Sequence, residues 1–272
     1  MMTEQQKKLV DMLSWFHNFC NQHNLRYYII AGTMLGAVRH GGFIPWDDDI
    51  DVGMPRNDYE RLRELSKDFS STRYLFEYPS MENREYSYLI AKLYDIQTTL
   101  IEKKRYPIKR GIYIDIFPLD GIGNTIEEAK INYKPFYRNF QLHLVITSSF
   151  LKRRSLQKNL AVLVGRVISP LFVNRHKLSK KIDNICKKFD FDNSKLVCNL
   201  LGGAGLKGIV PQDYFGKPTL IQFEGIQVYG LEKPDLYLKA MYGNYMELPP
   251  VEKQVSLHDA LECNLNQSFL DT

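Results

Sequence analysis

Residues 27–54, "YYIIAGTMLGAVRHGGFIPWDDDIDVGM", constrain this chain most, because four aspartates fall within five positions behind a glycine-containing segment. Acidic and apolar residues alternate at the end of this stretch, in "DIDVGM" (49–54). Successive side chains of a β-strand point to opposite faces, so the alternation predicts a strand with one acidic face and one buried face. Asp49 and Asp51 are then expected to lie close together on the same face.

Two carboxylates at that separation repel each other, which raises the pKa of one of them unless a cation lies between them. Hard oxygen ligands of this kind suit Mg²⁺ or Mn²⁺. A third carboxylate, Asp115, lies in another strand-like run, "GIYIDIFPLD". We therefore predict a metal site formed by Asp49, Asp51 and Asp115. The alternatives are a solvated acidic turn and, for Asp115, a structural pair with an arginine.

A calcium loop of the EF-hand type is excluded by the spacing. Such a loop needs glycine at its sixth position and glutamate at its twelfth. Counted from Asp47, those positions hold Val52 and Asp58. Asp47 and Asp48 are expected in the approach to the strand, where they orient the turn or accept supporting hydrogen bonds rather than bind metal.

The first half of the segment predicts a phosphate-binding turn. "RYYIIAG" (26–32) is typical of a buried strand, and "TMLGAVRH" (33–40) of a short helix that Thr33 caps. A glycine turn that leads into a helix presents free backbone amides to an anion, which makes Gly32 and Thr33 candidates for phosphate binding. An anion site followed by a carboxylate pair is the arrangement of a nucleotide polyphosphate site.

Four further side chains are candidates for contact with substrate. Arg39 and His40 follow the predicted helix and are placed to reach a phosphate oxygen or, equally, to cap the helix at the surface. Trp46 either stacks on a base or a quaternary ammonium, or anchors the core. Lys92 interrupts the apolar run "YLIAKLYD" and either contacts a phosphate or extends to solvent from a strand edge.

The rest of the chain predicts an α+β fold, with a mixed β-sheet flanked by helices and a helical insertion. We expect three parts: a catalytic core at 1–124, a mainly helical subdomain at 125–215, and a C-terminal hairpin and helix at 216–272 that complete the site. Within these parts, the patterns predict helices at 4–24 and 55–69, short strands between 74 and 120, helices across 125–191, a β-hairpin at 219–230 and a helix within 234–250.

Composition narrows the possible partners and location. A net charge of +5 is a mild bias towards anionic ligands or membrane surfaces and is no signature of nucleic-acid binding. The first residues lack a signal peptide, and the apolar run 160–173 is shorter than the roughly 20 residues of a membrane span, which predicts a cytoplasmic protein. The cysteines lack a C-x-x-C pair and are expected to be reduced thiols: Cys20, Cys186, Cys198 and Cys263.

These motifs resemble those of the nucleotidyltransferase superfamily. The run "AGTMLGAVRHGGFIPWDDDIDVGM", together with "GIYIDIFPLDGI" and "YLKAMYGNYMELPP", resembles the LicD family of diphosphonucleoside choline transferases, which are related to fukutin. The resemblance implies a nucleotidyltransferase-like core with Asp49 and Asp51 as paired metal ligands, Asp115 as the third acid, and Gly32 and Thr33 as the phosphate turn. It also makes His258 a site candidate.

The resemblance further implies transfer of phosphocholine, or a related phospho-alcohol, from a CDP-activated donor to a hydroxyl of a cell-surface glycan or teichoic-acid precursor, with release of CMP. One or two Mg²⁺ ions would serve the reaction, and Asp115 is expected to bind metal rather than act as general base. Such acceptors are lipid-linked, and the basic run 151–158 is expected either to touch anionic headgroups or to form a solvated helix face. A nucleotidyltransferase with a small acceptor and an inactive nucleotide- or metal-binding module are the alternatives.

Overall fold

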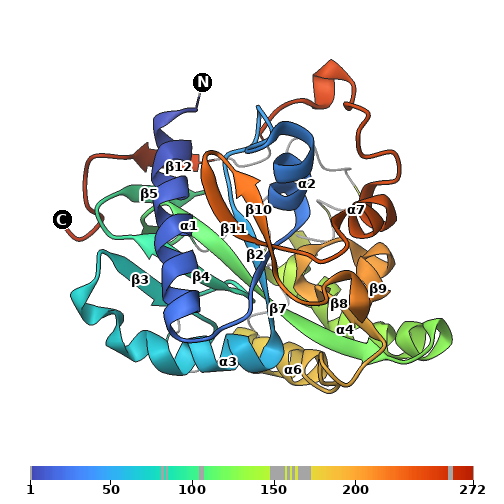
Figure 1. Cartoon of the computed structure of the whole chain (residues 1–272). Helices are drawn as coiled ribbons and strands as arrows, with labels where there is room; N and C mark the ends of the chain where they lie inside the picture. Colours follow the sequence, from blue (N-terminus) through green and yellow to red (C-terminus); the bar gives the residue numbers. More distant parts are fainter. Residues whose placement is uncertain are drawn as a thin grey trace.

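A computed structural model of the chain describes residues 2–80, 83, 85–103, 107–147, 157, 160, 163–164, 173–256 and 260–271. It shows the expected α+β fold, in which helices flank a mixed β-sheet (Figure 1). His258 lies outside the described residues, as does the basic run 151–158 except for Gln157. Within the described part of the chain, no helix has both the length and the hydropathy needed to span a bilayer.

The central sheet brings together strands from distant parts of the sequence. Its main path has the order β1-β2-β7-β4-β3, and β8 and β9 extend it from β7. The β2 and β7 strands are parallel, whereas β4 is antiparallel to β7. The strands are β1 (Tyr28–Ile29), β2 (Asp51–Pro55), β3 (Tyr74–Glu77), β4 (Ala91–Asp95), β7 (Tyr113–Gly123), β8 (Leu196–Cys198) and β9 (Ile209–Pro211).

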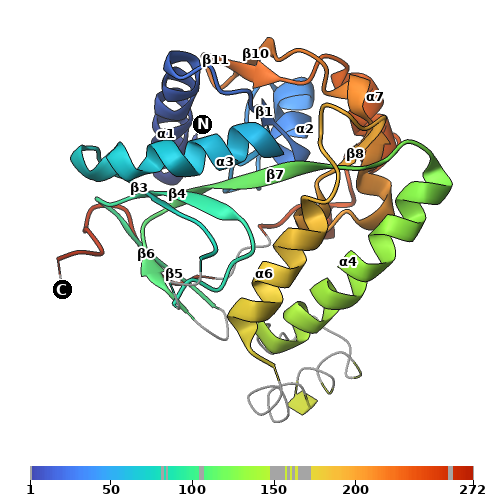
Figure 2. The same cartoon turned by 90° about the horizontal axis from the view of Figure 1, so that it is seen from below.

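Helices cover both sides of this sheet. Figure 2 shows α1 and α3 on one side of β7 and α4 and α6 on the other. The helices are α1 (Glu4–Gln22), α2 (Ala31–His40), α3 (Arg56–Leu65), α4 (Ile126–Thr147), α6 (Arg175–Cys186) and α7 (Pro234–Tyr242). The remaining strands form the hairpin of β10 (Thr219–Phe223) and β11 (Ile226–Gly230), and a small sheet of β5 (Thr99–Glu102), β6 (Lys109–Arg110) and β12 (Ala260–Asn264).

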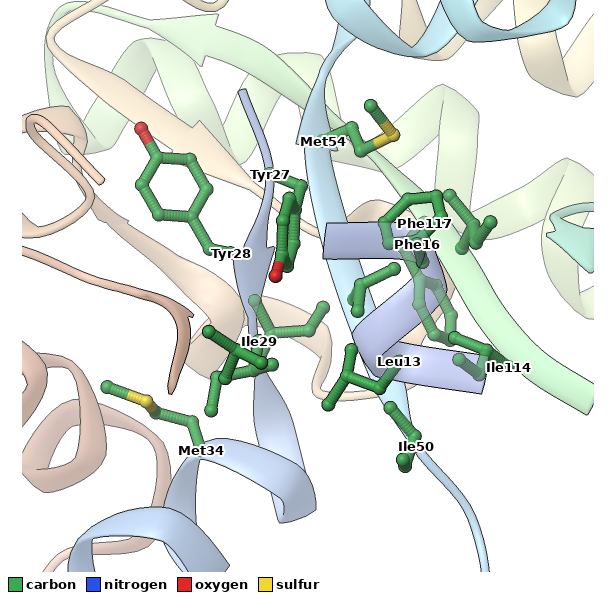
Figure 3. Close-up of a cluster of buried hydrophobic side chains, with 14 of the residues drawn as sticks. Leu13, Phe16, Tyr27, Tyr28, Ile29, Met34, Ile50, Met54, Ile114 and Phe117 are labelled. Atoms are coloured by element: carbon green, nitrogen blue, oxygen red, sulfur yellow. The ribbon is translucent and has the colours of Figure 1, made fainter. Parts of the chain in front are cut away.

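The N-terminal helix α1 confirms its prediction. Thr3 caps it in a reciprocal capping box with Gln6, which satisfies two backbone donors at the helix start. Its apolar face buries Leu13 and Phe16 against the sheet, where Ile114 of β7 belongs to the same cluster (Figure 3). Burial of a large apolar side chain contributes about 1.5–3 kcal/mol, so this face fixes the helix on the sheet.

Two element starts differ from the sequence prediction, and both lie next to the acidic run. The strand predicted at 49–54 begins at Asp51, and the helix predicted at 33–40 begins at Ala31. Thr33 is therefore inside the first turn of α2 and does not cap it; the N-cap residue is Ile30, without a side-chain cap. The Thr33 hydroxyl instead accepts a hydrogen bond from the backbone N–H of Asp51, at 2.8 Å.

Three other predictions can be compared with the described elements. The hairpin at 219–230 is confirmed. The helix predicted at 55–69 ends at Leu65, and a 3₁₀ helix follows it. The helix predicted within 234–250 ends at Tyr242, directly before Gly243, which has a positive φ. Glycine adopts this backbone conformation without the steric cost that other residues pay, so the helix ends there.

The section after residue 124 is attached to the core by a buried charge network. The Arg56 guanidinium donates to both carboxylate oxygens of Asp120 at 2.7 Å and to Asp183 of α6 at 2.9 Å. Arg56 is only 6% exposed and Asp120 only 1%. Breaking a buried pair of this kind costs about 3–5 kcal/mol, so the network holds α6 firmly against α3 and β7.

Candidate active site

Three charged side chains lie next to one another across the middle of the sheet. Asp51 of β2 is paired in register with Asp115 of β7, and Asp115 is paired in turn with Lys92 of β4. Residues paired in register point to the same face of a sheet. The strand order therefore forms a row of two acids and one base, which no local sequence pattern reveals.

Lys92 is an interior residue and does not extend from a strand edge. Its side chain is 2% exposed and forms an ion pair with Asp115. Its ammonium nitrogen lies 3.2 Å from the ring centroid of Tyr113 and 4.6 Å from that of Tyr88. The partner of Asp115 is thus a lysine held between two aromatic rings, and not the arginine that the sequence left open.

The other three aspartates precede β2 and form a compact group. Ligand oxygens of Asp47, Asp48 and Asp49 all lie within 4.8 Å of one another. Among the described residues this is the single such group of at least three acidic, histidine or cysteine side chains, and Asp51 and Asp115 are not members of it. The prediction that the strand includes Asp49 is wrong, because β2 begins at Asp51.

Electrostatics nevertheless connect the group to the strand acids. The pKa of Asp51 is raised well above its ordinary value, first by burial and then by the charges of Asp49, Asp115 and Asp47. Burial also raises the pKa of Asp115, and the ammonium of Lys92 opposes that shift. Ionised Asp51 is thus repelled by its acidic neighbours, and a cation beside it would relieve that repulsion.

Glutamines at the start of α1 hold the acidic loop in place. The side-chain amide of Gln6 donates to the backbone carbonyl of Asp47 at 2.9 Å, and that of Gln5 donates to the carbonyl of Asp48 at 3.0 Å. From the other end of the chain, the Ser256 hydroxyl donates to a carboxylate oxygen of Asp48 at 2.9 Å. Sequence reasoning missed all three supports, because they are tertiary contacts without a local motif.

The N-terminus of α2 faces this loop. A Cβ at Gly32 would lie 2.9 Å from an Asp47 carboxylate oxygen, so the Asp47 side chain would have to shift to admit a larger residue. The first amides of a helix have no partner within the helix. The amide of Ala31, a residue with φ of 48°, donates to the hydroxyl of Tyr237 at 3.3 Å. Gly32 and Thr33 thus lie beside the acids in the first turn of a helix, as a phosphate site requires.

Arg39, His40 and Trp46 are less directly connected to the acids. Arg39 and His40 end α2, roughly 12 Å along the helix axis from its first residue. Arg39 donates to the backbone carbonyl of Tyr245 at 2.8 Å, which fastens the loop after α7. His40 is exposed, and Trp46 is partly buried and packs against the main core. Of the two alternatives for Trp46, stacking on a ligand or anchoring the core, this packing agrees with the second.

Tyr242, at the end of α7, is a site residue that the sequence reasoning did not single out. Its pKa is raised by burial and then by the charges of Asp51, Asp47 and Asp49, so its hydroxyl lies within the field of the acids. Tyr242 lies in the block "YLKAMYGNYMELPP", whose pattern predicts a helix but does not mark this tyrosine as part of the site.

Comparison with known proteins agrees with this arrangement. The model of the LicD/FKTN/FKRP nucleotidyltransferase domain matches residues 24–156, which include the acidic loop, β2 and β7. Lipopolysaccharide cholinephosphotransferase LicD of Haemophilus influenzae is 31% identical over 261 residues, which cover 94% of this chain and 95% of that protein. This chain belongs to the LicD family. The family that the motifs indicated is thereby confirmed.

More distant relatives share only parts of this LicD-family chain. Human ribitol 5-phosphate transferase FKRP is 44% identical over 41 residues, 15% of this chain and 8% of that protein, which supports the relationship to fukutin. Mannosyltransferase regulator 4 of Saccharomyces cerevisiae is 28% identical over 118 residues, 42% of this chain and 10% of that protein. The identity to FKRP is thus high but covers a short segment.

Proposed function

We propose that this protein transfers phosphocholine, or a related phospho-alcohol, from a CDP-activated donor to a hydroxyl of a cell-surface glycan precursor and releases CMP. The observation that carries the proposal is the pairing of Asp51 with Asp115 in register, beside the acidic loop and the N-terminus of α2. Family membership supports it, because relatives are named as a cholinephosphotransferase and a ribitol 5-phosphate transferase.

The acids fit a divalent ion such as Mg²⁺ or Mn²⁺. We propose that Asp49, Asp51 and Asp115 hold it. The carboxylates whose oxygens already lie within 4.8 Å of one another are Asp47, Asp48 and Asp49, so Asp51 and Asp115 would have to approach the ion. Oxygen donors suit such an ion, which would relieve the repulsion at Asp51. When bound, the ion would neutralise charge on the donor diphosphate. The protein's own residues orient the diphosphate through the first amides of α2 and keep Asp115 in place through Lys92.

The position of attack decides the reaction class. If the acceptor hydroxyl attacks the phosphorus that carries the alcohol, the bond to the other phosphate breaks and CMP leaves. Attack on the nucleoside-linked phosphorus would instead place the nucleotide on the acceptor, which is the nucleotidyltransferase alternative. The names of the relatives favour the first course.

A screen of donors tests the proposal. The purified protein is incubated with Mg²⁺, a glycan acceptor and CDP-choline, CDP-ethanolamine, CDP-ribitol or CDP-glycerol, labelled in turn on the alcohol and on the cytidine. We expect CMP and alcohol label on the acceptor with one donor, and no turnover in excess chelator until Mg²⁺ is restored. Cytidine label on the acceptor would favour the nucleotidyltransferase, and binding without turnover would favour the inactive module.

We further propose that the acceptor is lipid-linked and that the protein meets it at the cytoplasmic face of a membrane. The net charge of +5 and the basic run 151–158 support this placement.

A further inference from the structure

A cavity of about 240 Å³ lies between α3, α6 and the segment that connects β3 to β4. Helix α6 supplies nearly half of its lining through residues spaced three or four apart, which is one face of a helix. These residues are His176, Ser179, Lys180, Asp183, Asn184 and Lys187. The helical section, to which no sequence motif gave a function, thus forms one wall of a cavity beside the catalytic core.

The charge of the cavity is opposite to that of the acidic site. Arg63, Lys180 and Lys187 line it, together with one acid, Asp183. Arg63 is paired with Glu60 at 2.6 Å and Lys187 with Asp183 at 2.7 Å, and Asp183 also accepts from Arg56. Lys180 is exposed and forms no ion pair with any described residue. The cavity therefore has positive charge available for an anionic ligand.

Other features of the lining suit a sugar. Three tyrosines, Tyr59, Tyr86 and Tyr88, contribute aromatic walls. The Nε atom of Arg63 is buried and has no hydrogen-bond acceptor among the described residues. Aromatic faces pack against the apolar faces of sugar rings, while a few convergent polar groups fix the orientation of a ligand.

Tyr88 links this cavity to the ion pair of Lys92 and Asp115. Its side chain lines the cavity, and its ring lies 4.6 Å from the Lys92 ammonium, which is paired with Asp115. The strand order places α2 and its phosphate-binding turn on the β2 side of Asp115, and Tyr88 on the β4 side. An in-line displacement needs the attacking and leaving oxygens on opposite sides of the transferred phosphorus.

We propose that this cavity binds an anionic sugar unit of the acceptor glycan, one that carries a phosphate or a carboxylate. The sugar would enter from the β4 side, and a neighbouring hydroxyl of the same glycan would extend past Tyr88 to the acids while the donor lies against α2. This inference rests on the proposed function, because it assigns the acceptor to a subsite of the same reaction.

Direct binding tests the cavity without relying on activity. The full chain is titrated by NMR with glucose 6-phosphate, with glucuronate and with neutral glucose. We expect one or both anions to bind and glucose not to, with Lys180→Glu weakening the anion about tenfold or more. Lys181→Glu is the matched control, because it makes the same charge change on an exposed residue of α6 that does not line the cavity.

The kinetic test separates this inference from the proposed function. In the transfer assay, Lys180→Glu should raise KM for the acceptor about tenfold and leave KM for the CDP-alcohol unchanged, and Lys181→Glu should change neither. Three results would overturn the cavity assignment. They are equal effects of the two substitutions, no binding of either anion, and displacement of the bound sugar phosphate by the CDP-alcohol. Failure of every donor to yield CMP would overturn the proposed function, while the NMR titration still decides the cavity.

Discussion

The acidic site and the cavity under α6 handle charge in opposite ways. At Asp51, burial and neighbouring carboxylates raise the pKa, so that negative charge remains uncompensated. The cavity presents the opposite charge through Lys180, which forms no ion pair with a described residue, while Arg56 behind the cavity is paired with Asp120 and Asp183. Uncompensated charge favours an ion or substrate as partner, whereas compensated charge favours a rigid support. A chain with a net charge of +5 can thus contain a strongly acidic site.

The two regions also differ in how far apart their residues are in the sequence. Most of the acidic site comes from residues 32–51, with Asp115 added by strand pairing. The cavity combines two residues of α3, five residues from the connection between β3 and β4, and six from α6 and its C-cap Lys187. A site encoded in one stretch can be found by its motif, and a site built from three distant segments requires the fold.

The largest expected effect is at the acidic site. Asp51→Asn should lower the rate of transfer by about a thousandfold, on the scale of losing a principal charge-stabilising group. The melting temperature should stay the same or rise, because the substitution removes a carboxylate that its neighbours repel. Transfer assays and calorimetry measure the two effects.

Asp11→Asn on the exposed side of α1 serves as the control for that substitution. Binding of glucose 6-phosphate in the cavity should survive Asp51→Asn, since the two regions do not share this residue. A variant that retains full transfer activity would remove Asp51 from the mechanism.

Acidification should weaken the packing of α4 and α6. His143 of α4 is 4% exposed, and burial followed by the charge of Arg175 lowers its pKa to about 4. In the unfolded chain the same histidine has a pKa of about 6.5. Between these two pKa values the unfolded chain therefore binds more protons than the folded one, and the free energy of unfolding falls as pH falls. The full loss would be roughly 3 kcal/mol.

Urea unfolding at pH 7 and pH 5 measures this effect, with His143→Gln as a variant that does not titrate. The wild type should lose more stability than the variant between the two pH values. Amide exchange should quicken in α4 and α6 more than in α1 and β7. Equal pH dependence of the two proteins would contradict a depressed pKa for His143.

The smallest expected effect concerns the support of the acidic loop. Gln6→Ala removes a capping-box contact and the hydrogen bond to the Asp47 carbonyl, so it should destabilise the protein by about 1–2 kcal/mol. The rate of transfer should fall severalfold, and binding in the cavity should not change. Gln22→Ala, at the exposed other end of α1, is the matched control. A similar loss of stability and transfer rate in the two variants would mean that the effect comes from the helix alone.

Sequence reasoning succeeded where the information is periodic or local. The sequence alone predicts the helix α1 from its apolar spacing and the β10–β11 hairpin from its alternation, and it shows the acidic run directly. It failed at the starts of α2 and β2, which lie two residues from their predicted positions, so that Thr33 is inside the helix and Asp49 lies before the strand. A shift of that size lies within the normal uncertainty of element boundaries, but it decides individual contacts.

By itself, the sequence determined that an acidic, glycine-preceded motif of the LicD family is present, because its spacing along one stretch is enough to recognise it. Only the tertiary structure decided that Asp115 has Lys92 for a partner, that Gln5 and Gln6 hold the acidic loop, and that α6 forms a cationic cavity behind Tyr88. The physical reason is that strand order and helix packing join residues whose separation in the chain gives no sign of contact.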